Sequence, residues 1–219
     1  MIINRGFKEF KFRHRSRKNQ IIYTSKKVKN DNDIINLIDN FLKEKNSFIF
    51  ESVEKGKIKG RYTIFGKNPD KIWEFNKDNS FLIKHKKKIK INKKPEKFIE
   101  EIIENFKFKI PNGLPPISSL ISGYFSYDSI RYIENIPNNC KDDLKIPDVR
   151  LLRPRTLIIY DNLKKKIFYI FNIFFDEKIS NYSKKYSEIK TELSKLIIQT
   201  FSKNLDNSNK IKSKKIKIK

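Results

Sequence analysis

The sequence is poor in the residues that build covalently linked or metal-held folds. It has one cysteine, Cys140, and two histidines, His14 and His85, among 219 residues. A single cysteine excludes an internal disulfide framework and a CxxC metal motif, and it fits a reducing compartment. Two histidines exclude a histidine-centred metal cluster, and because lysine or arginine flanks each of them, we expect both on the surface.

Long hydrophobic runs are also missing. No stretch approaches 18 apolar residues, and the N-terminus has no apolar core of a signal peptide. We therefore expect a soluble, cytoplasmic protein with no membrane partner.

Acidic residues and arginine are scarce relative to lysine. There are 25 Asp and Glu against 50 Lys and Arg, which gives a formal net charge of +25. Such a charge suits phosphate binding. However, the surplus is mostly lysine mixed with Asn, Ile and Phe, the residues of A/T-rich codons, and arginine forms no stripe along one face. We therefore expect no specific nucleic-acid partner and only nonspecific attraction to polyanions.

Alternating and helical hydrophobic patterns predict an α+β fold, with antiparallel sheets flanked by helices. Strands are expected at 20–25, 47–53, 60–66, 71–75, 81–85, 88–91, 151–160 and 166–175 and within 117–125, and helices at 32–44, 95–107 and 183–201. A turn is expected at 68–70. We divide the chain into a loose basic lead-in at 1–19, a folded domain at 20–203 and a disordered, lysine-rich tail at 204–219.

Two polar residues stand out where a strand pattern would carry none. Glu51 and Ser52 follow Phe48-Ile49-Phe50, and the next strand opens with Gly60-Arg61-Tyr62. A buried carboxylate is costly without a partner, so the pattern indicates a buried Glu-Ser pair beside an arginine. The alternative is the end of a strand with a solvated glutamate.

A second informative stretch runs from 117 to 136. Gly123 indicates a close approach between backbones, and Asp128 is a candidate cap for a short helix with Ile130 and Ile133 turned inward. We interpret the motif residues as structural, with a direct ligand role as the alternative; they are Gly123, Tyr124, Tyr127, Asp128 and Arg131.

These stretches together resemble the N-terminal domain of anthranilate synthase component I. The segment Phe48 to Gly66 resembles the family's Glu-Ser segment and its Gly-Arg-Tyr continuation, and 114–134 resembles its second N-terminal signature. A third run, Pro154 to Asp161, follows in the same order. The resemblance covers about residues 20–175.

The resemblance implies a role in tryptophan biosynthesis and a feedback site for L-tryptophan. Carried over, Ser52 would hydrogen-bond the amino acid, Glu51 would bind its ammonium group, and Arg61 would bind its carboxylate or pair with Glu51. The family converts chorismate and glutamine or ammonia into anthranilate and pyruvate, with a glutamine amidotransferase subunit as partner.

The signatures of the family's chorismate-binding half are not in this sequence. We expect an N-terminal fragment that is inactive alone, with no catalytic or metal-binding residues and no cofactor, because the Mg²⁺ of the family belongs to the other half. Two alternatives stay open. The chain could be the N-terminal part of aminodeoxychorismate synthase component I, from the folate pathway, or a stand-alone basic binding module.

Overall fold

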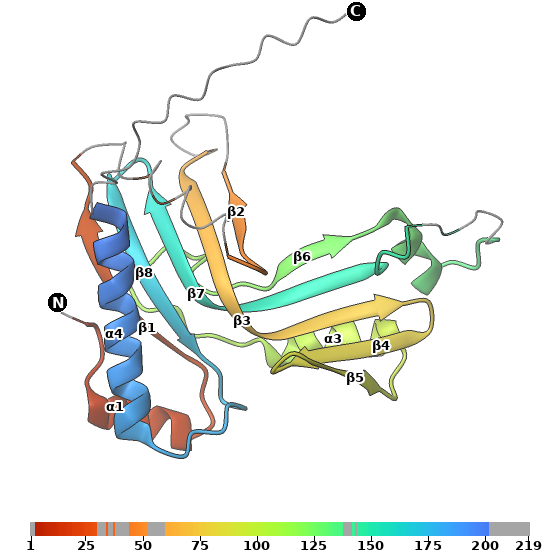
Figure 1. Ribbon diagram of the computed structural model, residues 1–219, viewed down its shortest axis with the longest axis horizontal. Coiled ribbons are helices and arrows are strands. Elements are labelled where there is room, and N and C mark those ends of the chain that lie inside the picture. The colour runs from red at the N-terminus through yellow and green to blue at the C-terminus, as the bar shows by residue number, and fades with distance from the viewer. Residues whose placement is uncertain are drawn as a thin grey trace, which may run out of the picture.

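The computed structural model describes residues 3–29, 34, 37, 44–51, 60–137, 142 and 144–201. Over these residues the predicted α+β class is confirmed, since eight strands form one antiparallel sheet flanked by helices (Figure 1). The strands are β1 Gln20–Lys27, β2 Phe48–Phe50, β3 Tyr62–Asn76, β4 Asn79–Lys84, β5 Lys87–Ile91, β6 Ser122–Phe125, β7 Val149–Asp161 and β8 Lys166–Ile173. The helices are α1 Phe7–Arg15, α3 Pro95–Asn105 and α4 Tyr182–Phe201, with the 3₁₀ helix η1 at Tyr127–Tyr132.

The sheet is built around the long antiparallel pair β3 and β7. Its order is β1-β8-β7-β3-β4-β5, with β2 beside β3 and β6 beside β7. The pair bends where Pro69 lies opposite Pro154, and the register shifts there between Pro69 and Lys71. Proline has no N–H to donate, so two facing prolines interrupt the ladder with little loss of hydrogen bonding. The bend divides the sheet into two arms (Figure 1).

The first arm contains β1, β8, β2 and the adjoining parts of β3 and β7. One face packs against α1, α4, Ile34 and Leu37, and the other against the segment 108–120. Because both faces are covered, β7 and β8 read as continuous apolar runs such as Leu157 to Tyr160, all buried.

The second arm contains β4, β5, β6 and the other parts of β3 and β7. Its dry face packs Trp73, Phe75, Val149 and Leu151 against Ile102 of α3. Alternation of apolar and polar residues, as in Ile72 and Glu74, predicts that this part of the sheet has one solvent-exposed face. Glu74 confirms it, since this side chain pairs with Arg150 and Lys88 on the opposite face.

Two expectations for single elements are wrong. The turn expected at 68–70 is the bulge within the continuous strand β3, so 60–66 and 71–75 belong to one strand. Ile133 does not face inward but is exposed, and the residue before η1 is Ser126, while Asp128 lies within the helix and pairs with Arg131.

The expectation of a loose lead-in at 1–19 is wrong for Phe7–Arg15, which form α1. Phe10 is fully buried against Tyr182 and Tyr186 of α4. His14 lies one helical turn further on, so it falls on the same face; it is buried, and its Nδ1 lies 3.0 Å from the Tyr182 hydroxyl. The prediction that His14 lies on the surface is therefore also wrong, whereas His85 is exposed as expected.

Part of the predicted organisation lies outside the described residues. Ile34 and Leu37 are helical and buried, in agreement with the helix expected at 32–44. The other residues of that segment up to 43, together with Ser52, Cys140 and the tail at 204–219, are not among the described residues.

Candidate functional site

The predicted effector site begins at β2, a three-residue strand at an edge of the first arm. Phe48 and Phe50 lie on the same side of this strand, and their ring centroids are 4.9 Å apart. Glu51 follows directly and is exposed to solvent. The expectation that Glu51 is buried is therefore wrong, because the short strand ends before it.

The apolar wall at β2 depends on a glycine in the neighbouring strand. Phe48 pairs with Gly66, and a Cβ placed on Gly66 would lie 2.2 Å from the Phe48 ring. Any side chain at 66 would therefore displace the ring. Gly66 lets Phe48 lie flat against β3.

Arg61 has an internal partner. Its Nε and Nη2 donate to the two carboxylate oxygens of Asp161 at 3.1 and 2.8 Å. The expected pairing of Arg61 with Glu51 is thus wrong. The backbone N–H groups of Leu163 and Lys164 also donate to Asp161, which is only 2% exposed, so this carboxylate joins the start of β3 to the β7–β8 turn.

The electrostatics of Asp161 favour its charged form. Burial raises the pKa of this carboxyl, but the hydrogen bonds from Arg61 and from the backbone of Lys164 and Leu163 outweigh burial and hold the pKa below its usual range. The sequence placed Asp161 at the end of the run from Pro154 but did not predict its pairing with Arg61, because a strand-ending aspartate before Asn162 is typical of a turn.

The second motif begins with a close contact. A Cβ on Gly123 would lie 2.0 Å from the carbonyl oxygen of Arg150 in β7, which confirms the expected close backbone approach. Arg131 of η1 donates to Asp128 at 3.1 Å and to the carbonyls of Ile136 and Pro137 at 2.8 and 2.7 Å.

The same motif presents large apolar side chains to solvent. Tyr127 is 91% exposed, and Phe125 and Ile133 are more than half exposed. Meanwhile the Tyr132 hydroxyl donates to Asp148 at 2.9 Å, and burial, followed by this hydrogen bond, raises the pKa of Tyr132. Arg131 and Tyr132 thus have polar partners inside the fold, whereas the buried hydroxyls of Ser119 and Ser126 have none and the large apolar side chains face outward.

The bend between the arms holds a network of ion pairs. Arg153 donates to both carboxylate oxygens of Asp70 at 2.8 and 2.5 Å and to Asp176 at 3.0 Å, and Lys71 also pairs with Asp176. The Arg153 guanidinium lies 3.8 Å from the centroid of the Phe174 ring. Glu177 extends the network to Arg155 and Lys185 at 2.5 and 2.6 Å.

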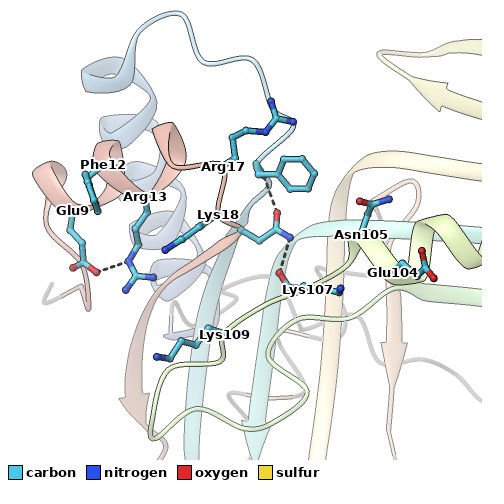
Figure 2. A pocket seen from close by; sticks show the side chains of 11 residues that line it. Glu9, Phe12, Arg13, Arg17, Lys18, Glu104, Asn105, Lys107 and Lys109 are labelled. Carbon is cyan, nitrogen blue, oxygen red and sulfur yellow. Dashed lines mark hydrogen bonds and ion pairs between the residues drawn. The ribbon is translucent and has the colours of Figure 1, made fainter.

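The described residues also form a hollow that lies away from the predicted effector site. It measures about 730 Å³ and is formed by the end of α1, the start of β1 and the segment after α3 (Figure 2). Asn19 holds these parts together, since its Nδ2 donates to the Lys107 carbonyl at 2.9 Å and its Oδ1 accepts from the Phe175 N–H at 2.9 Å. Sequence reasoning missed this hollow because its walls are about 90 residues apart in the chain.

Within the described part of the chain, no group of three or more His, Cys, Asp or Glu side chains could hold a metal ion. In that same part, no helix is long and apolar enough to cross a membrane.

Comparison with known proteins finds relatives of this chain. The chain is 34% identical over 177 residues to anthranilate synthase component 1 of Acetivibrio thermocellus and 28% identical over 167 residues to that of Cereibacter sphaeroides. These matches cover 80% and 74% of this chain. The chain is related to anthranilate synthase component I. No family model matches it.

The chain spans about a third of the length of its anthranilate synthase relatives, 35% of the first protein and 33% of the second. A crystal structure of anthranilate synthase component I from Streptococcus pneumoniae TIGR4 also matches, with a TM-score of 0.48 and 23% identity. That match covers 69% of this chain and 32% of the other.

Relationship to anthranilate synthase component I gives the two motifs a common context. Phe48 of the first motif and Ile117 of the second pack against the same buried cluster of the first arm. In addition, Asn46, just before β2, accepts a hydrogen bond at 3.0 Å from Arg150 of β7, whose partner in the sheet is Tyr124 of β6. The motifs are more than 50 residues apart in the sequence but adjoin in the fold.

Proposed function

We propose that this chain is the N-terminal, tryptophan-sensing and scaffolding part of an anthranilate synthase component I, in tryptophan biosynthesis. The complete enzyme would be a lyase that converts chorismate and ammonia into anthranilate, pyruvate and water. Glutamine would supply the ammonia through an amidotransferase subunit. The observation that carries the proposal is the 34% identity over 177 residues to an anthranilate synthase component 1.

The sensing role rests on the residues after β2. Glu51 is exposed and directly follows the Phe48–Phe50 wall, so its carboxylate is free to meet the ammonium group of L-tryptophan. Ser52 is adjacent in sequence and would hydrogen-bond the same ligand. Two donors of Arg61 are occupied by Asp161, so we propose that Arg61 helps to position the effector site and does not bind the ligand directly.

The scaffolding role rests on the apolar side chains of the second motif. Tyr124 and Phe125 of β6 and Tyr127 of η1 are exposed, and Phe50 of β2 is 47% exposed on the neighbouring arm. In Figure 1, β2 and β6 both lie on the inner side of the bend. A group of exposed apolar side chains on one side of a fold is typical of an interface. We propose that this inner side receives the chorismate-binding part.

Catalysis would reside in that other part. We propose that magnesium and chorismate bind there, and that this chain alone does not turn over chorismate. The complete enzyme would act in the cytoplasm, with the amidotransferase subunit as its partner.

A chimaera tests the proposal. Residues 1–201 of this chain would replace the matching region of the Acetivibrio thermocellus relative, and anthranilate formation would be followed by fluorescence. We expect activity that L-tryptophan inhibits. In the chimaera, Ser52→Arg should abolish the inhibition while leaving activity, because the larger cation would fill the ligand site.

Ser16→Arg, at an exposed serine after α1, is the matched control and should leave inhibition unchanged. Unchanged inhibition in the Ser52→Arg chimaera would remove this serine from the effector site. An aminodeoxychorismate product from a complete enzyme would instead favour the folate pathway.

A further inference from the structure

The hollow beside α1 concentrates positive charge without matching carboxylates. Its cationic side chains are Arg13, Arg17, Lys18, Lys107 and Lys109, here called the basic groove. Two carboxylates line the same hollow, and Glu9 already accepts from both Arg5 and Arg13, at 3.0 and 2.9 Å. Glu104 is therefore the one carboxylate of the hollow left to face the other four cations. An anionic ligand would meet several donors at once.

One arginine of the groove, Arg17, differs from most other arginines of the chain. Arg61, Arg131, Arg150, Arg153 and Arg155 each pair with a carboxylate within the fold. Arg17 is exposed, and its guanidinium lies 5.4 Å from the centroid of the Phe175 ring. Lysine enrichment from A/T-rich codons does not account for a cluster of arginines on one helix end.

An aromatic ring stands at the rim of the groove. Phe12 is 69% exposed, and Figure 2 shows it on α1, the helix that also supplies Arg13. Exposing a phenyl ring among charges gives the folded chain nothing by itself. Beside cations, such a ring offers a stacking platform for an unpaired base.

The form of the groove selects among anions. A small anion in an open groove would gain little, since each exposed ion pair contributes about 0–1 kcal/mol. A polyanion gains from several contacts together, from counterion release and from the field of a chain with a net charge of +25. Stacking on Phe12 favours an unpaired nucleic-acid strand over an acidic polypeptide.

We propose that the basic groove binds single-stranded nucleic acid without sequence preference. Phosphates would contact Lys18, Lys107 and Lys109, and a base would stack on Phe12. This activity is independent of the proposed role in tryptophan biosynthesis. It accounts for four cations of the groove, Arg17, Lys18, Lys107 and Lys109, that face a single carboxylate, Glu104.

The test measures binding of the full 219-residue chain to a fluorescein-labelled 20-nucleotide oligouridylate by anisotropy. The groove variant carries Lys18→Gln, Lys107→Gln and Lys109→Gln. Two variants with the same charge change serve as controls, one at Lys86, Lys87 and Lys90 around β5, and one at Lys214, Lys215 and Lys217 in the C-terminal sequence.

We expect the groove variant to lose affinity at least about tenfold and each control about twofold or less. The slope of log affinity against log salt should fall by about 2 in the groove variant, since a single strand contributes about 0.7 per phosphate contact. Phe12→Ala should lower affinity about tenfold with an unchanged slope. A circular dichroism spectrum and thermal midpoint equal to those of the unsubstituted chain would show that each variant folds.

Three outcomes would overturn the proposal. Equal losses in the groove and control variants would show that binding follows net charge alone. Normal affinity in Phe12→Ala together with equally effective competition by poly-glutamate would assign the groove to an acidic polypeptide. Failure of the chain to bind oligouridylate at 0.15 M salt would leave the groove without a nucleic-acid role.

Discussion

At the scale of single residues, Gly123 has no room for a side chain. A side chain there would meet the Arg150 carbonyl oxygen at 2.0 Å, and backbone atoms cannot move aside as a side chain can. We expect Gly123→Ala to lower the free energy of unfolding by about 2–3 kcal/mol, measured by urea denaturation. Gly6→Ala is the control, because nothing lies within 4 Å of a Cβ at Gly6. Equal effects at the two positions would contradict the tight pairing of β6 with β7.

Several non-glycine residues have positive φ, the backbone conformation that favours glycine. Lys77, in the tight β3–β4 turn, has φ +49°, which a side chain disfavours by about 1–2 kcal/mol. The chain has six glycines, and among those that the structure describes, Gly60 and Gly113 have positive φ. The scarcity of glycine agrees with the A/T-rich codon usage that also enriches lysine.

Lys77→Gly should therefore raise the free energy of unfolding by about 0.5–1 kcal/mol, since glycine removes the strain at this turn. The N–H of residue 77 would still donate to Asp148, as it does at 2.7 Å now. The same substitution at Lys90, in the extended strand β5, should be destabilising by a similar amount. Urea denaturation of both variants checks the opposite signs.

At the scale of elements, the strands were easier to predict than their junctions. Strands β7 and β8 follow from their apolar runs, and β4 and β5 from their alternation of apolar and polar residues. Because these patterns lie within each strand, the observed ranges agree with the expected ones. The bulge in β3 was predicted as a turn because Asn68-Pro69 is typical of one, and only the facing Pro154 explains why the strand continues. Glu51 was expected to be buried because the strand pattern was read as far as residue 53. Strand β2 ends after three residues because it lies at an edge of the sheet, and local sequence does not show this.

The ion-pair network at the bend should make stability depend on acid. Burial raises the pKa of Asp176, but Lys71 and Arg153 outweigh burial and hold that pKa below its usual range, and Arg155 and Lys185 do the same for the pKa of Glu177. A carboxyl whose pKa is lowered in the folded state stabilises the fold at pH values above its unfolded-state pKa, which is about 4. That contribution is lost as the pH falls from about 4 through the lowered pKa values.

We therefore expect the urea midpoint to fall steeply below about pH 4 and to fall less steeply in Asp176→Asn and Glu177→Gln. Both variants should also be less stable at pH 7, because each leaves a cation without its partner. Glu134→Gln, at an exposed position, provides the control. Parallel pH curves for all four proteins would show that the bend network does not carry the acid sensitivity.

At the scale of the whole molecule, the candidate sites depend on contacts that no local pattern reveals. The resemblance to a known family located the β2 and η1 motifs from sequence. It did not reveal that Asp161 holds Arg61 or that Arg150 links the region of β2 to β6, because these pairs are about 100 residues apart. The basic groove joins residues 13–18 to 107–109, and lysine enrichment throughout the chain concealed it.

The contact between α1 and α4 packs the first described helix against the last. Phe10 stacks on Tyr186 with ring centroids 5.7 Å apart and is completely buried. Phe10→Ala should therefore lower the free energy of unfolding of the whole chain by about 3–5 kcal/mol. Phe12→Ala, two residues away on the same helix and 69% exposed, should change it by less than about 0.5 kcal/mol. Urea denaturation followed both by circular dichroism and by tyrosine fluorescence would measure both variants. A loose N-terminal segment would make the two substitutions equally neutral, whereas a helix integral to the core makes the first costly in every probe.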